Sequence, residues 1–213
     1  MSTNILVSSK DNKSDRYIIG THDGVFHADD VTACAILALY HSNKQVEIIR
    51  SKDISFLMQQ KVNIMVDVGK GEYDHHQPGG NGKRENGIPY ASAGLIWRDY
   101  GEKLISKYYK ELYGVLLEEN NSLSSSIATE IDEKVIQFID KEDSGIPTST
   151  HTFSYISSFL PVYNSSYSDF DSAFKLAFDT TVEVLKHVIF EIISLVKSKE
   201  DVFHMVKYHL LFW

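Results

Sequence analysis

The chain has 213 residues, enough for one substantial α/β domain or for one domain and part of a second. Hydrophobic residues make up 43% of it and charged residues 23%, which excludes a largely disordered chain. The formal net charge of -8 argues against a protein that binds nucleic acid through a basic surface alone. Such a charge suits a protein that binds divalent cations and lets them attract a phosphate.

The single cysteine, Cys34, lies in an apolar run where a buried helix residue is expected. One cysteine fits a reducing compartment. The N-terminus lacks the apolar segment of a secretory signal. The longest apolar stretch, 182–196, is interrupted by charged residues and predicts an amphipathic helix rather than a membrane span. We therefore expect an intracellular protein without membrane contact, and the sequence does not choose among cytoplasm, nucleus and mitochondrion.

The first third of the chain predicts alternating strands and helices. After a polar, flexible tail at 1–16, the predicted elements are a strand at 17–21, a helix at 29–40, a strand at 46–50, a helix at 53–60 and a strand at 62–68. This βαβαβ order predicts an α/β fold with a mostly parallel sheet and helices on both faces.

The rest of the chain is predicted to be mainly helical. Its elements are a glycine-rich loop at 79–87, a helix at 92–100, a helical pattern to about 117, an Asn- and Ser-rich surface loop at 120–126, a helix at 127–139 and an amphipathic helix from 169 to about 199. Gly101 is expected to end the first helix, and Asp169 or Asp171 to cap the last.

The end of the chain, from Val202 to Trp213, is apolar and aromatic. Because an exposed terminus of this kind is unusual, the pattern indicates truncation. We divide the chain into a tail at 1–16, a metal-binding catalytic domain at 17–160, and a helical segment at 161–213 that begins an incomplete C-terminal region. The apolar end is expected to pack against the domain or against a second copy, which would give a homodimer.

Four short segments gather acidic and histidine side chains where a strand gives way to a loop or helix. They are HDGVFHADD at 22–30, VDVG at 66–69, DHHQ at 74–77 and EDSG at 142–145. Because the carboxyl ends of parallel strands lie along one edge of a sheet, these groups are expected to converge there. Mixed His and Asp ligands suit Mn²⁺, Zn²⁺ or Fe²⁺ better than Ca²⁺.

Taken singly, most of these residues have an ordinary explanation as a loop residue, a helix cap or a turn residue: His22, Asp29, Asp30, Asp67 and Asp143. The dipeptide His75-His76 directly after Asp74 is harder to explain by packing. The occurrence of all four segments in this order favours a metal site.

The order of the four segments resembles that of the DHH phosphoesterase superfamily. Longer segments resemble the melanocyte-proliferating-gene family of metal-dependent hydrolases more closely: GTHDGVFHADDVTACAIL, DVGKGEYDHHQPGG, GKRENGIPYASAGLIW and IDKEDSGIP. The resemblance runs from about residue 17 to about residue 195. Because some members of that family are 3′–5′ RNA exonucleases, it implies a metal-dependent phosphodiesterase acting on RNA or short nucleotides.

The resemblance also implies a site for two divalent metal ions, Mn²⁺ first, with Zn²⁺ or Mg²⁺ as alternatives. Six residues would bind them, with the fourth as the bridge: His22, His27, Asp29, Asp67, His75 and Asp143. Asp140, one helical turn from Asp143, is the alternative ligand. His76 would face the substrate phosphate, and Asp74 would orient an imidazole. The paired ions would supply hydroxide for in-line attack on phosphorus.

Lys83, Arg84 and Ser92 form a second layer around the predicted ligands, and two interpretations of these residues are open. They are either solvated loop charges and a helix N-cap, or contacts to a substrate phosphate or ribose where a glycine-rich loop enters a helix. The resemblance does not include the family's C-terminal Gly-Gly-His type motif, since this sequence has no glycine after Gly145. The alternatives are therefore a catalytically weak or truncated metal-binding protein and a hydrolase of small substrates such as pyrophosphate.

Overall fold

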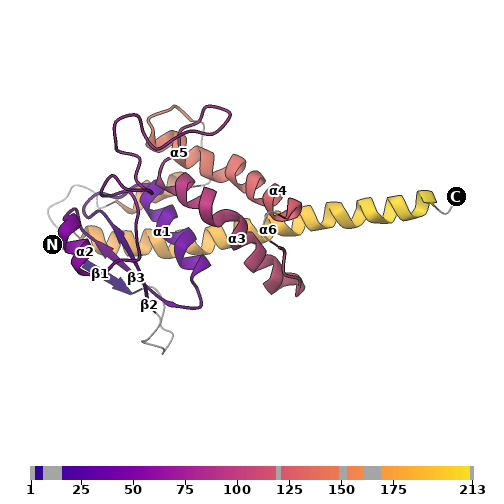
Figure 1. Ribbon diagram of the computed structural model, residues 1–213, viewed down its shortest axis with the longest axis horizontal. Helices are drawn as coiled ribbons and strands as arrows, with labels where there is room; N and C mark the ends of the chain where they lie inside the picture. The colour runs from indigo at the N-terminus through magenta and orange to yellow at the C-terminus, as the bar shows by residue number, and fades with distance from the viewer. Residues whose placement is uncertain (1–2, 7–15, 119–120, 149–152, 161–168, 212–213) are drawn as a thin grey trace.

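A computed structural model describes residues 3–6, 16–118, 121–148, 153–160 and 169–211 (Figure 1). Its four strands are β1 (Thr3–Leu6), β2 (Arg16–Thr21), β3 (Gln45–Arg50) and β4 (Ile64–Met65), and they form one sheet in the order β1-β3-β2-β4. Strand β2 pairs in parallel with both β3 and β4, whereas β1 joins the edge antiparallel to β3. The predicted α/β fold with a mostly parallel sheet is confirmed.

Six α-helices accompany the sheet within the described residues: α1 (Ala28–Tyr40), α2 (Ile54–Gln59), α3 (Ser92–Tyr113), α4 (Ser122–Ile131), α5 (Gln137–Asp143) and α6 (Phe170–Leu211). A π-helical turn, η1 (Asp132–Ile136), joins α4 to α5. A 3-10 helix, η2 (Ser154–Phe159), precedes α6. Most of the second half is therefore helical, as the sequence predicts.

Helix α1 lies at the centre of the core. Every residue from Asp29 to Leu39 is buried, because α1 contacts α3 and α6 and shares one apolar cluster with strands β2 and β3. The opposite face of the sheet is covered by α2, whose Leu57 packs with Ile49 and Val68. Helices therefore cover both faces of the sheet, as predicted.

The N-terminal strand is a departure from the predicted tail. Residues Thr3–Leu6 pair with β3, from Thr3 opposite Arg50 to Leu6 opposite Glu47. The prediction of a loose tail is wrong for these four residues, because the edge of β3 offers backbone partners that polar flanking sequence does not reveal. Residues 1–2 and 7–15 lie outside the described residues.

Gly101 does not end α3, which continues to Tyr113. A Cβ atom at position 101 would lie 2.9 Å from the indole of Trp97, so the glycine makes room for that ring inside the helix. The helix ends instead at Gly114, whose φ of 72° is the left-handed conformation of a glycine C-cap.

The predicted surface loop at 120–126 is also wrong, since α4 already begins at Ser122. The side chain of Asn121 accepts the backbone N–H of Leu123 at 2.9 Å and so caps the helix. Asn and Ser favour loops and helix N-termini alike, and here the polar run forms the first turns of a helix.

Helix α6 begins at a cap and ends far from the core. Asp169 accepts the backbone N–H of Ser172 at 3.0 Å, which confirms it as the cap. Helix α6 packs on the core as far as Val196, whereas its C-terminal part projects beyond the rest of the molecule (Figure 1). The helix runs to Leu211 rather than to about residue 199. The expected packing of 202–213 concerns side chains outside the described residues.

Membrane crossing finds no support among the helices that the structure describes. None of them combines the length and the apolar character that a span needs.

Candidate metal centre

Two neighbouring strands deliver the first pair of candidate ligands. His22 follows β2 directly, and Asp67 follows β4, which lies beside β2 in the sheet. Their side chains meet with 3.3 Å between His22 Nε2 and Asp67 Oδ2. Asp67 has a φ of 52°, which is strained for a residue with a side chain, and its N–H donates to the carbonyl of Tyr73 at 2.9 Å. Backbone strain of this kind is found at functional sites.

The first turn of α1 adds two fully buried carboxylates, Asp29 and Asp30. Asp30 accepts the backbone N–H of His27 at 2.7 Å and so closes the start of its own helix. Asp29 reaches α3 instead, where it accepts the N–H groups of Ser92 at 3.0 Å and Ala93 at 2.7 Å. It thereby caps α3 from another helix and holds the positive end of that helix against the cluster.

The Asp-His-His segment is fixed by its own backbone. Asp74 accepts the N–H of Lys70 at 2.6 Å and the N–H of His76 at 3.0 Å, and its Oδ1 lies 2.8 Å from His76 Nδ1. His75 points to the end of α5, where its Nε2 lies 2.9 Å from Asp143 Oδ2. Burial would raise the pKa of Asp74, but the backbone N–H donors of His76 and Lys70 lower it.

The six predicted metal ligands come together in this structure. They fall into adjoining groups whose ligand atoms all lie within 4.8 Å of one another: His22 with His27 and Asp67, Asp67 with His75 and His76, and Asp29 with His75 and Asp143. The first and second groups have Asp67 in common, and the second and third have His75 in common. His76, predicted to face the substrate, is therefore also placed where it could bind metal.

Several buried atoms of the cluster lack a hydrogen-bond partner. They are Oδ2 of Asp30, Oδ2 of Asp67 and Nε2 of His75. Although the last lies close to carboxylate oxygens, its geometry is not that of a hydrogen bond. Since leaving buried polar atoms unpaired is costly, this is the arrangement expected of side chains that share a cation. The residues present fit a divalent metal.

The electrostatics of the cluster agree with this fit. Burial and the charge of Asp67 raise the pKa of the Asp29 carboxyl. Burial alone would lower the pKa of His22, but the neighbouring carboxylates of Asp67 and Asp30 raise it to about 9. Burial would also lower the pKa of His75, but Asp143 and Asp67 raise it to about 11. The carboxylates thus hold positive charge on the imidazoles, and divalent cations would compete with those protons.

Asp140 and Asp143, the alternative ligands on α5, have different surroundings in the structure. Asp140 is buried away from the ligand groups; it accepts the N–H of Gly94 at 3.0 Å and lies 2.7 Å from Arg84 Nη1. Position 94 must be glycine, because a Cβ there would collide with the Asp140 carboxylate and lie 2.9 Å from the Arg84 guanidinium. Asp143, not Asp140, lies with the candidate ligands.

Arg84 is used inside the fold. Its Nε and Nη2 donate to the two carboxylate oxygens of Asp132 at 2.7 and 2.6 Å, and its guanidinium lies 4.3 Å from the centre of the Tyr90 ring. The side chain is buried. Its guanidinium thus joins the 79–90 loop to η1 and α5, and the reading of Arg84 as a substrate contact stays a prediction.

Ser92 and Lys83, which the sequence groups with Arg84, differ from each other in their surroundings. Ser92 is fully buried and donates to Asp67 Oδ1 at 3.3 Å, so it orients a candidate ligand. It is not the N-cap of α3, which is Ala91. Lys83 is exposed on the loop and pairs its backbone with that of Pro89.

The sequence did not single out Arg50, which anchors the loop of the first motif. Its fully buried guanidinium donates to the carbonyl of Gly24 at 2.9 Å and to Asp171 at 2.6 Å, and it stacks 4.3 Å from the Phe174 ring centre. Arg50 thus ties the His22–His27 loop to the start of α6. The signal in the sequence that could have identified Arg50 is a charged residue at the end of an apolar strand.

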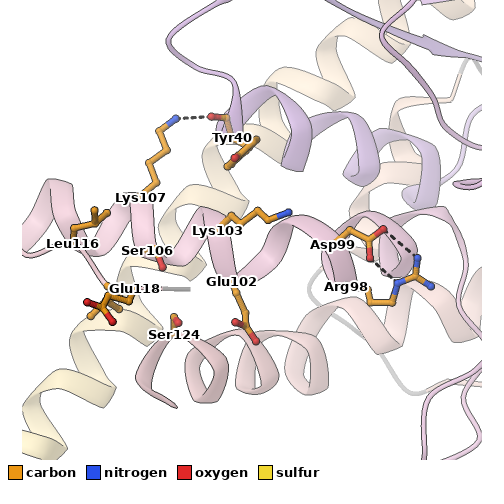
Figure 2. Close-up of a pocket in the computed structure, with 11 residues that line it drawn as sticks. Tyr40, Arg98, Asp99, Glu102, Lys103, Ser106, Lys107, Leu116, Glu118 and Ser124 are labelled. Atoms are coloured by element: carbon orange, nitrogen blue, oxygen red, sulfur yellow. Dashed lines mark hydrogen bonds and ion pairs between the residues drawn. The ribbon is translucent and has the colours of Figure 1, made fainter. Parts of the chain in front are cut away.

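A large surface cavity of about 690 Å³ lies along α3 and is separate from this cluster (Figure 2). Some of its charged residues are engaged with near neighbours: Lys107 donates to the carbonyls of Leu39 and Tyr40, and Arg98 pairs with Asp99. None of its described lining residues is a candidate ligand. The His/Asp cluster is therefore the candidate functional site.

Known proteins resemble this chain as follows. The profile of MYG1_exonuc, uncharacterised protein family UPF0160, matches residues 18–209. The chain is 34% identical to the MYG1 protein of Dictyostelium discoideum over 158 residues, which are 70% of this chain and 43% of the relative. It is 30% identical to the MYG1 exonuclease of Homo sapiens over 188 residues, which are 78% of this chain and 48% of the relative. The chain thus spans about half the length of these curated relatives. No solved structure matches it.

Proposed function

The chain belongs to the MYG1 family, and we propose that it is a metal-dependent phosphoester hydrolase that removes nucleotides from the 3′ end of RNA or short oligonucleotides. Several relatives are named exonucleases, and they supply the reaction class. The resemblance of the motif order to that of DHH phosphoesterases suggests the proposed use of two cations, with Mn²⁺ first and Zn²⁺ or Mg²⁺ as alternatives.

One observation carries the proposal: the adjoining His/Asp groups share Asp67 and His75. His22 and His27 complete one end of the cluster, and Asp29 and Asp143 complete the other. A carboxylate with candidate ligands on both sides suits a bridge between two ions, which single-metal sites do not need. Divalent ions in such sites activate water and neutralise charge on phosphoryl oxygens.

The chain's own side chains would orient the substrate and handle protons. The His76 side chain is 57% exposed, and its Nδ1 is held by Asp74, which leaves Nε2 outside that pairing. We assign His76 to hydrogen-bond a phosphoryl oxygen or to protonate the leaving oxygen. Asp74 fixes the ring, and its lowered pKa keeps it ionised for that task.

The test is hydrolysis of a 5′-labelled single-stranded RNA oligomer with Mn²⁺, and we expect shortening from the 3′ end that EDTA abolishes. His75→Ala, prepared identically, controls for contaminating nuclease, because it removes a ligand shared by two groups. Inorganic pyrophosphate should be a poor substrate by comparison. Hydrolysis that survives EDTA or the His75 variant would contradict the proposal, as would faster hydrolysis of pyrophosphate than of RNA.

A further inference from the structure

A smaller cavity, of about 290 Å³, adjoins the candidate metal ligands. Four of its lining residues belong to the cluster itself: His27, Asp29, His76 and Asp143. The wall beyond them comes from the loop before α1, from α5 and from η2. A group bound in this cavity would therefore touch whatever is held at the metal centre.

The wall away from the cluster has a distinct chemistry. Its apolar lining consists of the fully buried Phe26, Ile139 and Phe153 and of the partly exposed Ala28 and Leu160. The hydroxyls of Ser154 and Ser157 come from η2, whose serines are exposed. Among the described residues that line the cavity there is no Lys or Arg, and Glu142 adds a negative charge. The described part of this wall therefore offers an anion no cationic side chain, and an opposite charge would come only from cations at the cluster end.

We infer that this cavity takes the nucleoside attached to the scissile phosphate, with the phosphate at the cluster and the base against the apolar wall. This inference rests on the proposed function and names the substrate part that the site recognises. Apolar side chains suit the faces of a base, and hydroxyls suit its edges or the sugar. At the lower end of the range of about 300–1,000 Å³ for small-molecule sites, the cavity holds one nucleoside rather than an oligonucleotide.

The same features distinguish nucleotides from small inorganic substrates. Pyrophosphate is all charge, and this wall offers it apolar carbon, hydroxyls and a carboxylate. A nucleoside monophosphate gains from both ends of the site, because the cluster takes its phosphate and the cavity takes its uncharged remainder. The cavity therefore selects nucleotides over pyrophosphate.

The test compares ligands on the full chain with Mn²⁺, by calorimetry. We expect adenosine 5′-monophosphate to bind at least about tenfold more tightly than inorganic phosphate, since burial of the nucleoside adds apolar contact. Ser157→Trp, which fills the cavity, should remove that advantage and leave phosphate affinity unchanged. The matched control is Ser158→Trp, because Ser158 is an exposed serine of the same η2 that does not line the cavity.

Equal affinities of the unaltered protein for the two ligands would overturn the inference, even if the tryptophan variant failed to fold. Equal losses in the two serine variants would overturn it too. A titration of adenosine without metal, followed by saturation-transfer NMR, distinguishes failure of this inference from failure of the proposed function. Adenosine binding with no phosphate binding would support the inference about the cavity and contradict the metal site. Phosphate binding without a nucleoside advantage would support the metal site and contradict the inference about the cavity.

Discussion

Asp67→Asn is expected to lose at least one bound metal ion and to lower kcat/KM by about 100-fold or more, since even residues that merely support a metal ligand cost about 10–100-fold. Asp67 lies 3.3 Å from His22 and 3.4 Å from His75 through its two oxygens, so its charge faces both ends of the cluster. Asparagine preserves the side-chain shape and tolerates the left-handed backbone at this position. The fold should therefore survive, and metal analysis with steady-state kinetics measures the effect.

Asp23→Asn is the matched control for this variant. Asp23 is adjacent to His22, but it contacts the His22 ring through its backbone carbonyl, at 3.1 Å from Nδ1, and that contact does not depend on the carboxylate. Metal content and kcat/KM should stay close to those of the unaltered protein. If the two variants lose metal equally, Asp67 is no more than a strand-end residue.

Arg84→Met is expected to destabilise the protein by about 3–5 kcal/mol, the cost of removing one partner from a buried ion pair. The guanidinium lies between Asp132 and Asp140, and its loss leaves both carboxylates without their counter-charge. Burial already raises the pKa of Asp140 to about 7 despite Arg84. Urea denaturation at constant pH measures the change in free energy of unfolding.

Arg98→Met provides the comparison, because Arg98 also pairs with an aspartate and also lies near the Tyr90 ring. Its pair with Asp99 is partly exposed to solvent, so its removal should cost less than about 1 kcal/mol. Similar small losses in the two variants would show that the Arg84 network contributes little to the fold. Weaker Mn²⁺ binding by Arg84→Met alone would show that α5 must be anchored to place Asp143.

The candidate site was more predictable than its surroundings because it follows from strand order. His22 and Asp67 stand at the carboxyl ends of their strands, and the βαβαβ pattern puts those ends side by side. The dipeptide His75-His76 is visible in any reading of the sequence. What the pattern omits is the long-range partner: Asp29 caps a helix that starts 63 residues later, and no local signal reveals that contact.

Local propensity failed where one residue type serves two purposes. Gly101 is read as a helix end, yet it accommodates Trp97 within α3. Arg84 sits beside Lys83 in a glycine-rich loop and is read as a solvated or substrate-binding charge, yet it pairs with Asp132, 48 residues away. In both cases tertiary packing decides the role, and the relevant neighbour lies outside the window in which a pattern is read.

Calorimetric titration of Mn²⁺ into the metal-free protein at pH 7, in buffers of different ionisation enthalpy, tests the central claim most directly. We expect saturation at about two ions per chain, because the adjoining ligand groups share Asp67 and His75. Binding should release protons, since the pKa values of His22 and His75, about 9 and about 11, keep both rings protonated at pH 7 until metal displaces those protons. Affinity should therefore rise with pH. Titrations that show no saturable binding, or binding whose heat is independent of the buffer, would contradict the account.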